Sequence, residues 1–255
     1  MNNIIMETRD LKKIYGSKGA SFVALDGVDL KIEKGDFLGI MGPSGAGKTT
    51  LLNLISTIDK PTSGKIIFEG TDLSNIKDRD LSRLRRNSIG FIFQDFNLLD
   101  NMTIEDNIAL PLALEKKNYK NILSKVHNIS EFFGIRDHLK KYPYQLSGGQ
   151  KQRTAAARAL ITSPSVIFAD EPTGALDSKS SAELLQSMIK MNEEYKTTIM
   201  MVTHDAFAAS YCKRILFLKD GKIHAKLDKN ESRKEFFNRI LDLLGSLGGG
   251  NHELL

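Results

Sequence analysis

The stretch FLGIMGPSGAGKTTLLNLI, residues 37–55, decides the fold. An apolar run leads into a glycine-rich turn, residues 42–49, that matches the pattern G-x-x-x-x-G-K-[ST]. Glycines let successive backbone N–H groups converge on phosphate oxygens, because no Cβ atom stands in the way. The apolar helix that follows adds a field that favours anions at its N-terminus. The sequence therefore predicts a strand, a phosphate-binding loop and a helix, with an accidental glycine turn as the alternative.

Each position of this turn has an expected place around a nucleotide. Lys48 is expected at the β- and γ-phosphates, and the Thr49 hydroxyl is expected to bind Mg²⁺. The residues predicted to bind the nucleotide here are Gly42, Pro43, Ser44, Gly45, Ala46, Gly47, Lys48, Thr49 and Thr50.

A second stretch, SVIFADEP at residues 165–172, supplies carboxylates at the end of an apolar run. Asp170 is expected to hold the Mg²⁺ shell, and Glu171 to point at the γ-phosphate and polarise an attacking water. Two carboxylates after a strand can also cap the next segment, which is the structural alternative. Together the two stretches predict a P-loop nucleotide hydrolase, a class that includes kinases, helicases, GTPases and transport motors.

Short apolar runs that alternate with helical patterns predict an α/β fold. Four runs are expected to be buried parallel strands: 37–42, 88–94, 165–171 and 198–205. Ligand groups on such sheets lie at the carboxyl ends of the strands. Residues 21–42 and 63–70 predict an additional antiparallel β subdomain, and residues 214–227 a late hairpin with Asp220-Gly221 at its turn.

Residues from about 95 to 162 have a mostly helical pattern, which predicts an inserted α-helical subdomain. The whole of residues 1–245 is expected to be one domain, followed by a Gly-rich tail at 246–255. Before that tail, four apolar residues recur at helical spacing: Phe236, Phe237, Ile240 and Leu244. Packing of this helix on the body of the protein or on a second copy is favoured over membrane binding.

Composition excludes several classes of protein. The chain has 255 residues, of which 41% are hydrophobic and 26% charged, as in ordinary soluble proteins. No apolar run approaches the roughly 20 residues that span a bilayer, and the N-terminus lacks the pattern of a secretory signal. The single cysteine, Cys212, fits a reducing cytosol. The net charge of +5 decides little; residues 77–86 are the densest basic stretch, interpreted as a solvated helix face rather than a nucleic-acid surface.

The stretch LSGGQKQRTAAARAL, residues 146–160, predicts an unusual helix start. Ser147 is a good N-cap, and Gly148 and Gly149 leave the first backbone N–H groups uncovered. Such an exposed N-terminus suits a phosphate, yet residues 42–49 already bind one in the same chain. The nucleotide facing this helix is therefore expected to be held by another molecule, in a head-to-tail dimer of two copies with ATP between them.

With LSGGQ standing between the P-loop and ADEP, the chain resembles the ATP-binding cassette (ABC) ATPases. The resemblance covers about residues 4 to 245 and includes four more positions. Tyr15 resembles the aromatic residue that stacks on adenine, and Gln94 in FIFQD the Q-loop glutamine that reaches Mg²⁺ and the attacking water. Asp177 in GALD resembles the D-loop, which crosses the dimer interface. His204 in VTHD resembles the switch histidine at the γ-phosphate.

The resemblance implies roles for these residues beside plainer alternatives. It implies that Glu171 is the general base and that His204 and Gln94 are further catalytic residues. The nucleotide-binding set gains Tyr15, Ser147, Gly148, Gly149, Gln150 and Asp177, and the metal set is Thr49, Gln94 and Asp170. Each match also has a structural interpretation: Tyr15 as a packed surface tyrosine, Gln94 as a strand-end polar residue, His204 as a core histidine and Asp177 as a helix cap.

Longer phrases, such as FADEPTGALDSKS and THDAFAASYC, resemble the bacitracin- and lantibiotic-resistance branch, the Bce type. That branch implies ATP and Mg²⁺ as ligands and a place at the cytoplasmic face of the membrane. Its partners are a membrane permease, whose coupling helix enters a groove beside Gln94, and, in many complexes, a sensor histidine kinase reached through the permease. Two departures are the Gly-rich GSKGAS after Tyr15 and glycine at Gly174, where many cassettes have serine.

Three alternatives remain beside this assignment. One treats the complex chiefly as a flux sensor for a kinase, with transport secondary, and sequence cannot separate it from resistance because both use the same ATPase cycle. The same ATPase chemistry serves lipoprotein-release, macrolide-efflux-like and cell-division complexes. A non-transport ABC ATPase of DNA repair or the ribosome is the alternative of another class. It is disfavoured because this chain has one P-loop, one LSGGQ and no long heptad array.

Overall fold

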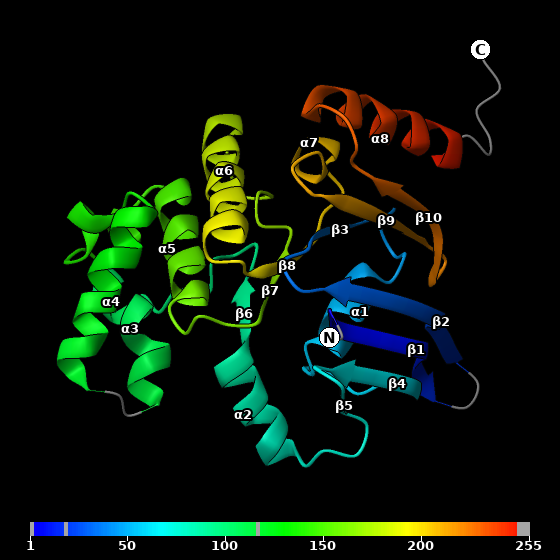
Figure 1. The fold of residues 1–255 in the computed structure, drawn as a ribbon, viewed down its shortest axis with the longest axis horizontal. Coiled ribbons are helices and arrows are strands. Elements are labelled where there is room, and N and C mark those ends of the chain that lie inside the picture. The colour runs from blue at the N-terminus through cyan, green and yellow to red at the C-terminus, as the bar shows by residue number, and fades with distance from the viewer. Residues whose placement is uncertain (1–2, 18–19, 116–117, 249–255) are drawn as a thin grey trace.

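The fold is known from a computed structural model, which describes residues 3–17, 20–115 and 118–248. These residues form two sheets (Figure 1). The larger sheet has the order β10-β9-β3-β8-β7-β6, and the smaller has the order β2-β1-β4-β5. The larger sheet consists of β3 (Phe37–Met41), β6 (Ile89–Ile92), β7 (Val166–Asp170), β8 (Thr198–Val202), β9 (Arg214–Lys219) and β10 (Lys222–Asp228).

Neighbouring strands β9, β3, β8, β7 and β6 run parallel, which confirms the four predicted parallel strands and adds β9 to them. The predicted late hairpin is β9–β10, with Asp220 and Gly221 at positive φ in its turn. The sequence placed β9 in a hairpin but not in the parallel core. Its pairing with β3 is a contact between segments more than 170 residues apart, which no local pattern encodes.

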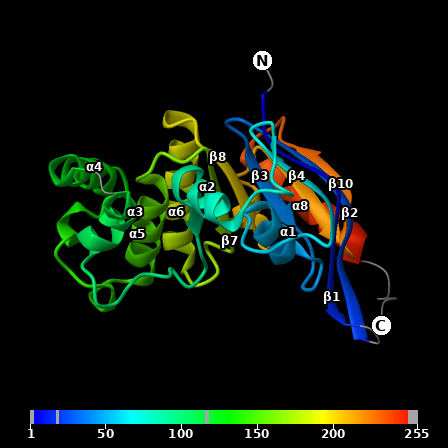
Figure 2. The ribbon, with the colours of Figure 1, turned by 90° about the horizontal axis from the view of Figure 1, so that it is seen from below.

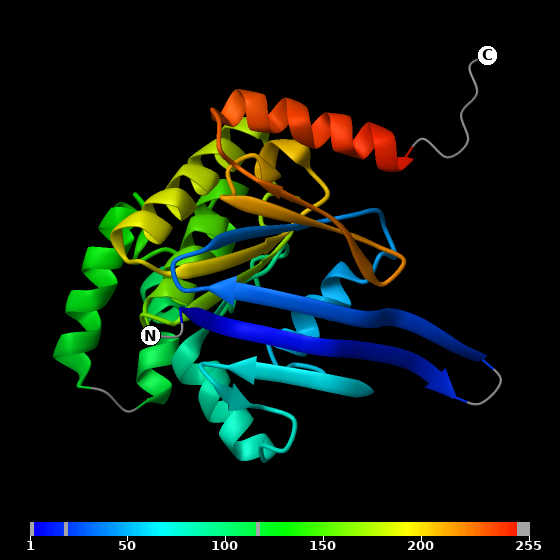
Figure 3. The ribbon, with the colours of Figure 1, turned by 45° about the vertical axis from the view of Figure 1, so that its right-hand side comes forward.

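The antiparallel sheet lies beside this core and includes a long projecting hairpin (Figure 3). Its strands are β1 (Ile4–Ser17), β2 (Ala20–Glu33), β4 (Ser63–Phe68) and β5 (Thr71–Asp72). Helix α1 (Lys48–Ile55) contacts strands of both sheets. The GSKGAS segment is the end of the β1–β2 ladder, where Gly16 pairs with Ser21; residues 18 and 19 lie outside the described residues.

Helices cover the other face of the core sheet and extend to one side of it (Figure 2). They are α3 (Ile104–Leu114), α4 (Tyr119–Phe132), α5 (Gly148–Leu160), α6 (Ser178–Glu194), α7 (Ala206–Ala209) and α8 (Arg233–Gly248), with short 3-10 turns at Arg136–His138 and Pro143–Gln145. Helix α2 (Asp78–Ser88) instead packs through Leu81 in the cluster that contains α1. Helices α3, α4 and α5 pack on one another within the predicted helical insertion. The predicted fold class, a P-loop α/β core with an antiparallel β subdomain and a helical subdomain, is confirmed.

Alternating residues of each core strand face two separate hydrophobic clusters. Val166 and Phe168 pack toward α1 and the antiparallel sheet, whereas Ile167 and Ala169 pack toward the helices on the other face. The sheet is therefore buried on both faces, as parallel sheets are.

Two predicted helices have the surroundings expected of them. Phe236 and Ile240 of α8 are buried in the main core, so this helix packs on the body of the protein. It continues to Gly248, beyond the expected start of the tail at residue 246, and residues 249–255 lie outside the described part. Helix α2, which contains most of the basic stretch, buries only Leu81 among its described residues, as a solvated helix does.

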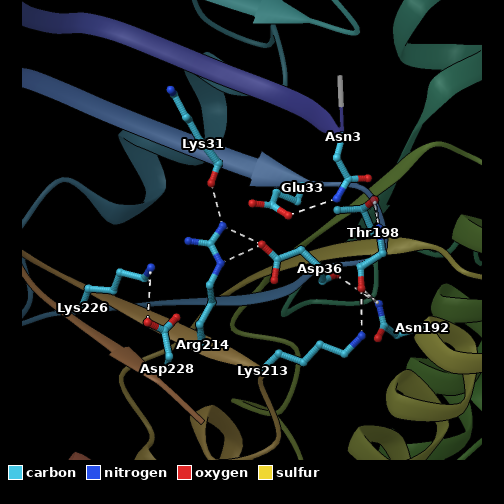
Figure 4. A network of polar contacts seen from close by, with 11 residues as sticks. Asn3, Lys31, Glu33, Asp36, Asn192, Thr198, Lys213, Arg214, Lys226 and Asp228 are labelled. Carbon is cyan, nitrogen blue, oxygen red and sulfur yellow. Dashed lines mark hydrogen bonds and ion pairs between the residues drawn. The ribbon is translucent and has the colours of Figure 1, made fainter. Parts of the chain in front are cut away.

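A network of polar contacts lies at the amino ends of β3, β8 and β9 (Figure 4). Arg214 donates through Nε and Nη2 to Asp36 Oδ2, at 2.8 and 2.6 Å. The Asn192 side-chain amide donates to the carbonyls of Gly35, Asp36 and Thr197. Asp36 and Arg214 are 8% and 17% exposed, so this is a buried charge pair in which both partners are satisfied.

Candidate nucleotide site

The P-loop connects β3 to α1 and depends on glycines for its path. Gly42, Gly45 and Gly47 all have positive φ. A Cβ atom on Gly42 would meet the carbonyl oxygen of Leu218, and one on Gly47 would meet that of Ala24. Gly47 is the residue before α1 and has a left-handed backbone. The accidental-turn alternative does not explain a loop wrapped this tightly around the start of a helix.

Lys48 lies at the centre of the loop with its ammonium group held in place. Its Nζ donates to the carbonyl oxygens of Gly42 and Pro43, each at 2.9 Å. Burial lowers the pKa of Lys48, while the charges of Glu171 and Asp170 raise it. The three charged groups therefore share one small region, although Lys48 is more than 120 positions from the two carboxylates in the chain.

Asp170 ends β7 with a carboxylate that is left without a hydrogen-bond partner. Its Oδ1 is buried and makes no hydrogen bond to any described residue. Burial raises the pKa of Asp170, the charge of Glu171 raises it further, and Lys48 opposes both. A buried polar oxygen without a hydrogen-bond partner is unusual in a fold, so Asp170 is a candidate ligand-binding residue.

Glu171 has a backbone conformation that is unusual for a glutamate. Its φ is +43°, in the left-handed region, and its N–H donates to the Val202 carbonyl at 2.9 Å. Such strain persists only where neighbouring contacts hold it, and it concentrates at functional sites. The side chain is 25% exposed, and its Oε1 lies 3.0 Å from His204 Nδ1. The alternative of a carboxylate cap for the next segment does not fit, because the cap of α6 is Asp177.

His204 follows β8 and is not a core histidine. Its side chain is 67% exposed, and its Nδ1 lies 3.0 Å from Glu171 Oε1. The P-loop, His204, Glu171 and Gln94 thus follow β3, β8, β7 and β6, four neighbouring parallel strands in that order. The structure brings these predicted residues to one edge of the sheet, where ligands bind to open α/β sheets.

Gln94 lies in an exposed loop after β6 and is packed beside the D-loop. A Cβ atom on Gly174 would lie 3.1 Å from Cδ and Nε2 of Gln94. A side chain at position 174 would contact this amide closely, and the exposed Gln94 side chain would have to shift slightly to admit it. Asp177 itself caps α6, accepting from the N–H groups of Lys179 and Ser180.

Tyr15 is near the tip of β1, and the residue is 40% exposed. Its hydroxyl donates to Asp59 Oδ2 at 2.8 Å, and Lys13 Nζ lies 4.7 Å from the ring centroid. Burial raises the pKa of Tyr15, and the hydrogen bond to Asp59 acts in the same direction. Asp59 follows α1, so the ring is tied to the same element that begins at the P-loop.

The LSGGQ segment starts α5 with the predicted cap. Ser147 Oγ accepts from the Gln150 N–H, and Gln150 Oε1 accepts from the Ser147 N–H at 3.0 Å, which forms a capping box. The account of the glycines needs a correction. Gly149 is buried, and a Cβ there would lie 2.7 Å from Ser180 Oγ, so close packing on α6 requires this glycine.

Three residues near these groups were missed at the level of sequence. His138 Nε2 lies 2.9 Å from Gln150 Nε2, so it supports the capping amide. Asp59 holds Tyr15, and the buried Gln152 hydrogen-bonds two loops. None of the three belongs to a motif that the sequence analysis recognised. The polar Gln152, next to the alanine-rich part of helix 148–160, could have suggested a buried hydrogen bond.

Helix α5 lies far from α1 in the same chain. In both Figure 1 and Figure 2 it is on the opposite side of β7 from α1. The predicted nucleotide-binding residues therefore form two separate groups in one molecule. Tyr15, the P-loop, Asp170, Glu171 and His204 make one group, and Ser147, Gly148, Gly149 and Gln150 make the other.

The residues fit a divalent cation that takes most of its ligands from phosphate and water. No group of three or more His, Cys, Asp or Glu side chains with a metal-site arrangement occurs among the described residues. The buried unpaired Oδ1 of Asp170 and the exposed Thr49 at the start of α1 are hard oxygen donors. Mg²⁺ is bound through few carboxylates and through substrate phosphates, so this donor set suits it.

This arrangement defines a P-loop nucleotide hydrolase in which a second capped helix start, that of α5, lies apart from the P-loop (Figure 1). The family model described as "ABC transporter" matches residues 25–174, and the chain belongs to that family. It is the ATP-binding, ATP-hydrolysing subunit of an ABC transporter. No helix in the described ranges is both long enough and apolar enough to cross a membrane.

Two bacterial proteins and one solved structure are similar to it. The chain is 49% identical to the bacitracin export ATP-binding protein BceA of Halalkalibacterium halodurans, over 96% of this chain and 97% of that protein. It is 48% identical to the uncharacterised ABC transporter ATP-binding protein YvcR of Bacillus subtilis, over 98% of this chain and 97% of that protein. The dimeric ATP-binding cassette MJ0796, in a post-hydrolysis state with ADP and Pi, has a TM-score of 0.82 and 37% identity over 89% of this chain and 100% of that one.

Proposed function

We propose that this subunit drives an ABC complex that protects cells from peptide antibiotics directed at the cell wall, such as bacitracin or lantibiotics. The observation that carries the proposal is the 49% identity to a bacitracin export ATP-binding protein over nearly the full length of both chains. The phrases FADEPTGALDSKS and THDAFAASYC support the same branch. The subunit acts at the cytoplasmic face of the membrane, bound to a permease.

Hydrolysis depends on the residues that follow the four neighbouring strands. Glu171 accepts the proton of the attacking water, and His204, at 3.0 Å, holds the carboxylate in position and faces the γ-phosphate. Lys48 neutralises phosphate charge from the centre of the P-loop, and Gln94 orients the water from the neighbouring strand end. Tyr15 stacks on the adenine, with Asp59 fixing its hydroxyl.

Mg²⁺ would be held by Asp170, Thr49 and Gln94. When bound, the ion neutralises the charge that develops on the phosphate oxygens. Its positive charge would also stabilise the Asp170 carboxylate, whose pKa is raised by burial in the free protein.

The second anion-binding group belongs to a two-copy sandwich. Because α5 and α1 lie on opposite sides of β7, the start of α5 serves the nucleotide of the partner copy. Ser147, Gly148, Gly149 and Gln150 would close on the phosphates, and Asp177 would lie at the interface between the copies. The solved cassette at 37% identity is itself dimeric, which supports this arrangement.

A groove of about 330 Å³ beside the Q-loop is the proposed seat of the permease's coupling helix. Its walls come from the end of α2, β6, the Q-loop, α3 and α5, and include Arg85, Phe93, Leu110, Leu114 and Arg158. The groove therefore touches the segment that contains Gln94 and connects the permease to the hydrolysis site. Through the same permease, the complex would report to a sensor histidine kinase.

The test is a susceptibility panel in the organism that carries the gene. The gene is deleted and restored as wild type, Glu171→Gln or Glu194→Gln; the last is the same chemical change at an exposed position on α6. Growth is scored against bacitracin, a nisin-like lantibiotic, a macrolide and vancomycin. Sensitivity confined to the cell-wall peptides, rescued by wild type and Glu194→Gln but not by Glu171→Gln, supports the proposal. An unchanged panel with a division or envelope defect would instead assign the subunit to a cell-division or lipoprotein-release complex.

A further inference from the structure

One buried side chain on α5 hydrogen-bonds two loops of the hydrolysis site. Gln152 is fully buried, with no measurable exposure. Its Nε2 donates to the carbonyl of Phe93 at 3.0 Å and to the carbonyl of Pro172 at 2.7 Å. Two carbonyl oxygens can only accept, so the amide orientation is fixed by its partners.

The two carbonyls belong to residues next to the proposed catalytic side chains. Phe93 immediately precedes Gln94, and Pro172 immediately follows Glu171. One nitrogen atom therefore fixes the backbone at the Q-loop glutamine and at the general base together. Glu171 needs such support because its left-handed φ of +43° is a strained conformation for a glutamate.

The amide oxygen of Gln152 contributes unfavourably to the free energy of folding. Its Oε1 is buried and has no hydrogen-bond partner among the residues that the structure describes. An apolar side chain of the same length would avoid that cost. The two hydrogen bonds that Nε2 donates are therefore the reason for an amide at position 152.

A second side chain attaches the Q-loop to the same helix. Arg158 donates to the carbonyls of Phe96 and Asn97, at 2.9 and 2.5 Å. Helix α5 thus holds both ends of the Q-loop. Of these two contacts, the one made by Gln152 also reaches the loop of Glu171.

We infer that Gln152 is a positioning residue that couples the seating of α5 to the alignment of Glu171 and Gln94. The inference rests on the proposed catalytic roles of those two residues. Helix α5 begins at LSGGQ, the proposed contact with the partner's nucleotide. Closure of the dimer moves α5, and Gln152 transmits that movement to the water-activating groups. ATP binding does not depend on it, because the P-loop and Tyr15 lie on other elements.

The decisive variant is Gln152→Met, which keeps the length of the side chain and removes both donated hydrogen bonds. Gln152→Asn, whose shorter amide cannot reach both carbonyls, gives a milder change that measures the same effect if the methionine variant folds poorly. Thr154→Val is the matched control. Thr154 is equally buried on α5, but its hydroxyl donates only to the Gln150 carbonyl within the helix.

The measurements are kcat and KM for ATP, and the amount of ATP-bound dimer by size-exclusion chromatography of the purified chain. Gln152→Met should lower kcat by about tenfold or more, as misplaced catalytic groups do, with KM within about twofold of wild type. It should also accumulate the ATP-bound dimer, because closed dimers form but hydrolyse slowly. Gln152→Asn should lie between Gln152→Met and wild type, and Thr154→Val should match wild type.

A merely structural role gives the opposite dimer result, since a loosened fold loses the dimer along with activity. The inference is overturned if kcat of Gln152→Met equals that of Thr154→Val, or if kcat, ATP binding and the dimer decline together. Glu171→Gln is measured in parallel. If it neither slows hydrolysis nor accumulates a dimer, the proposed catalytic site is wrong, whatever Gln152→Met does.

Discussion

The two ends of the central sheet differ in how a buried carboxylate is partnered. At the amino ends of β3, β8 and β9, Asp36 is bound by Arg214, and Asn192 satisfies three carbonyls (Figure 4). At the carboxyl end of β7, Asp170 keeps a buried oxygen with no partner among the described residues. The buried charge of Asp36 is compensated within the fold, whereas the Asp170 oxygen is left for a ligand in the proposed site. Two aspartates at opposite ends of one sheet thus have different roles: Asp36 is structural, and Asp170 is the proposed ligand-binding residue.

The largest expected effect comes from Glu171, at the unpaired end. Glu171→Gln removes the general base and should slow ATP hydrolysis by about 10²–10⁴-fold, with little change in the free energy of unfolding. Steady-state turnover and chemical denaturation of one preparation check both halves of this expectation. Wild-type turnover in this variant would show that the carboxyl end of the sheet does not hold the base.

At the paired end, Asp36→Asn should affect stability and not catalysis. It leaves the Arg214 guanidinium largely buried without its counter-charge, which should cost about 2–3 kcal/mol and lower Tm by roughly 4–8 °C. Differential scanning calorimetry measures the shift, and turnover per folded molecule should stay unchanged. The double variant Asp36→Leu with Arg214→Met removes both charges and should recover part of the loss. Equal Tm values for Asp36→Asn and wild type would show that the pairing contributes nothing.

Asp170→Asn should stabilise the ligand-free protein, whereas Asp36→Asn should destabilise it. Asp170 Oδ1 has no hydrogen-bond partner among the described residues, and the nearby charge of Lys48 only partly offsets the effect of burial. Removing the charge should therefore stabilise the ligand-free protein by about 1 kcal/mol, although hydrolysis is lost. Because burial raises the pKa of Asp170, the wild-type carboxyl binds its proton more tightly when folded than when unfolded. Its contribution to stability is therefore greatest below the unfolded pKa and is lost as pH rises through the folded pKa.

Urea unfolding of wild type and Asp170→Asn at several pH values tests that sign. The two proteins should be similar in stability near pH 4 and should differ most near pH 7, in favour of the asparagine variant. If Asp170→Asn is the less stable protein at neutral pH, the carboxylate has a partner that stabilises it, and the contrast with Asp36 does not hold.

The smallest effect is expected at the edge of the nucleotide site. Tyr15→Phe keeps the ring and removes the hydrogen bond to Asp59, so KM for ATP should rise by about two- to fivefold with kcat unchanged. Tyr195→Phe, at another half-exposed tyrosine, should leave KM unaltered and is the control. An unchanged KM for Tyr15→Phe would mean that Asp59 does not orient the ring.

Local patterns predicted much of this molecule, and long-range pairing explains what they left out. The P-loop, the strand runs and the Ser147 cap are encoded within a few residues, so they could be found from the sequence. Asp36 and Arg214 are 178 positions apart, and Gln152 meets Phe93 and Pro172 across 59 and 20 positions. The buried face of Gly149 and the left-handed Glu171 likewise depend on neighbours that only the folded chain supplies.

Cys212 has a practical consequence of its own. It is the single cysteine of the chain and is fully buried, with its thiol pKa raised by that burial, so the thiolate that reacts with alkylating agents is scarce. Maleimide should leave the native protein unmodified. A cysteine introduced at the exposed Ser178, beside Asp177 but outside the predicted nucleotide-binding set, would then be the sole reactive thiol. A fluorescent or spin label at this position can report the approach of two copies without prior removal of a native cysteine.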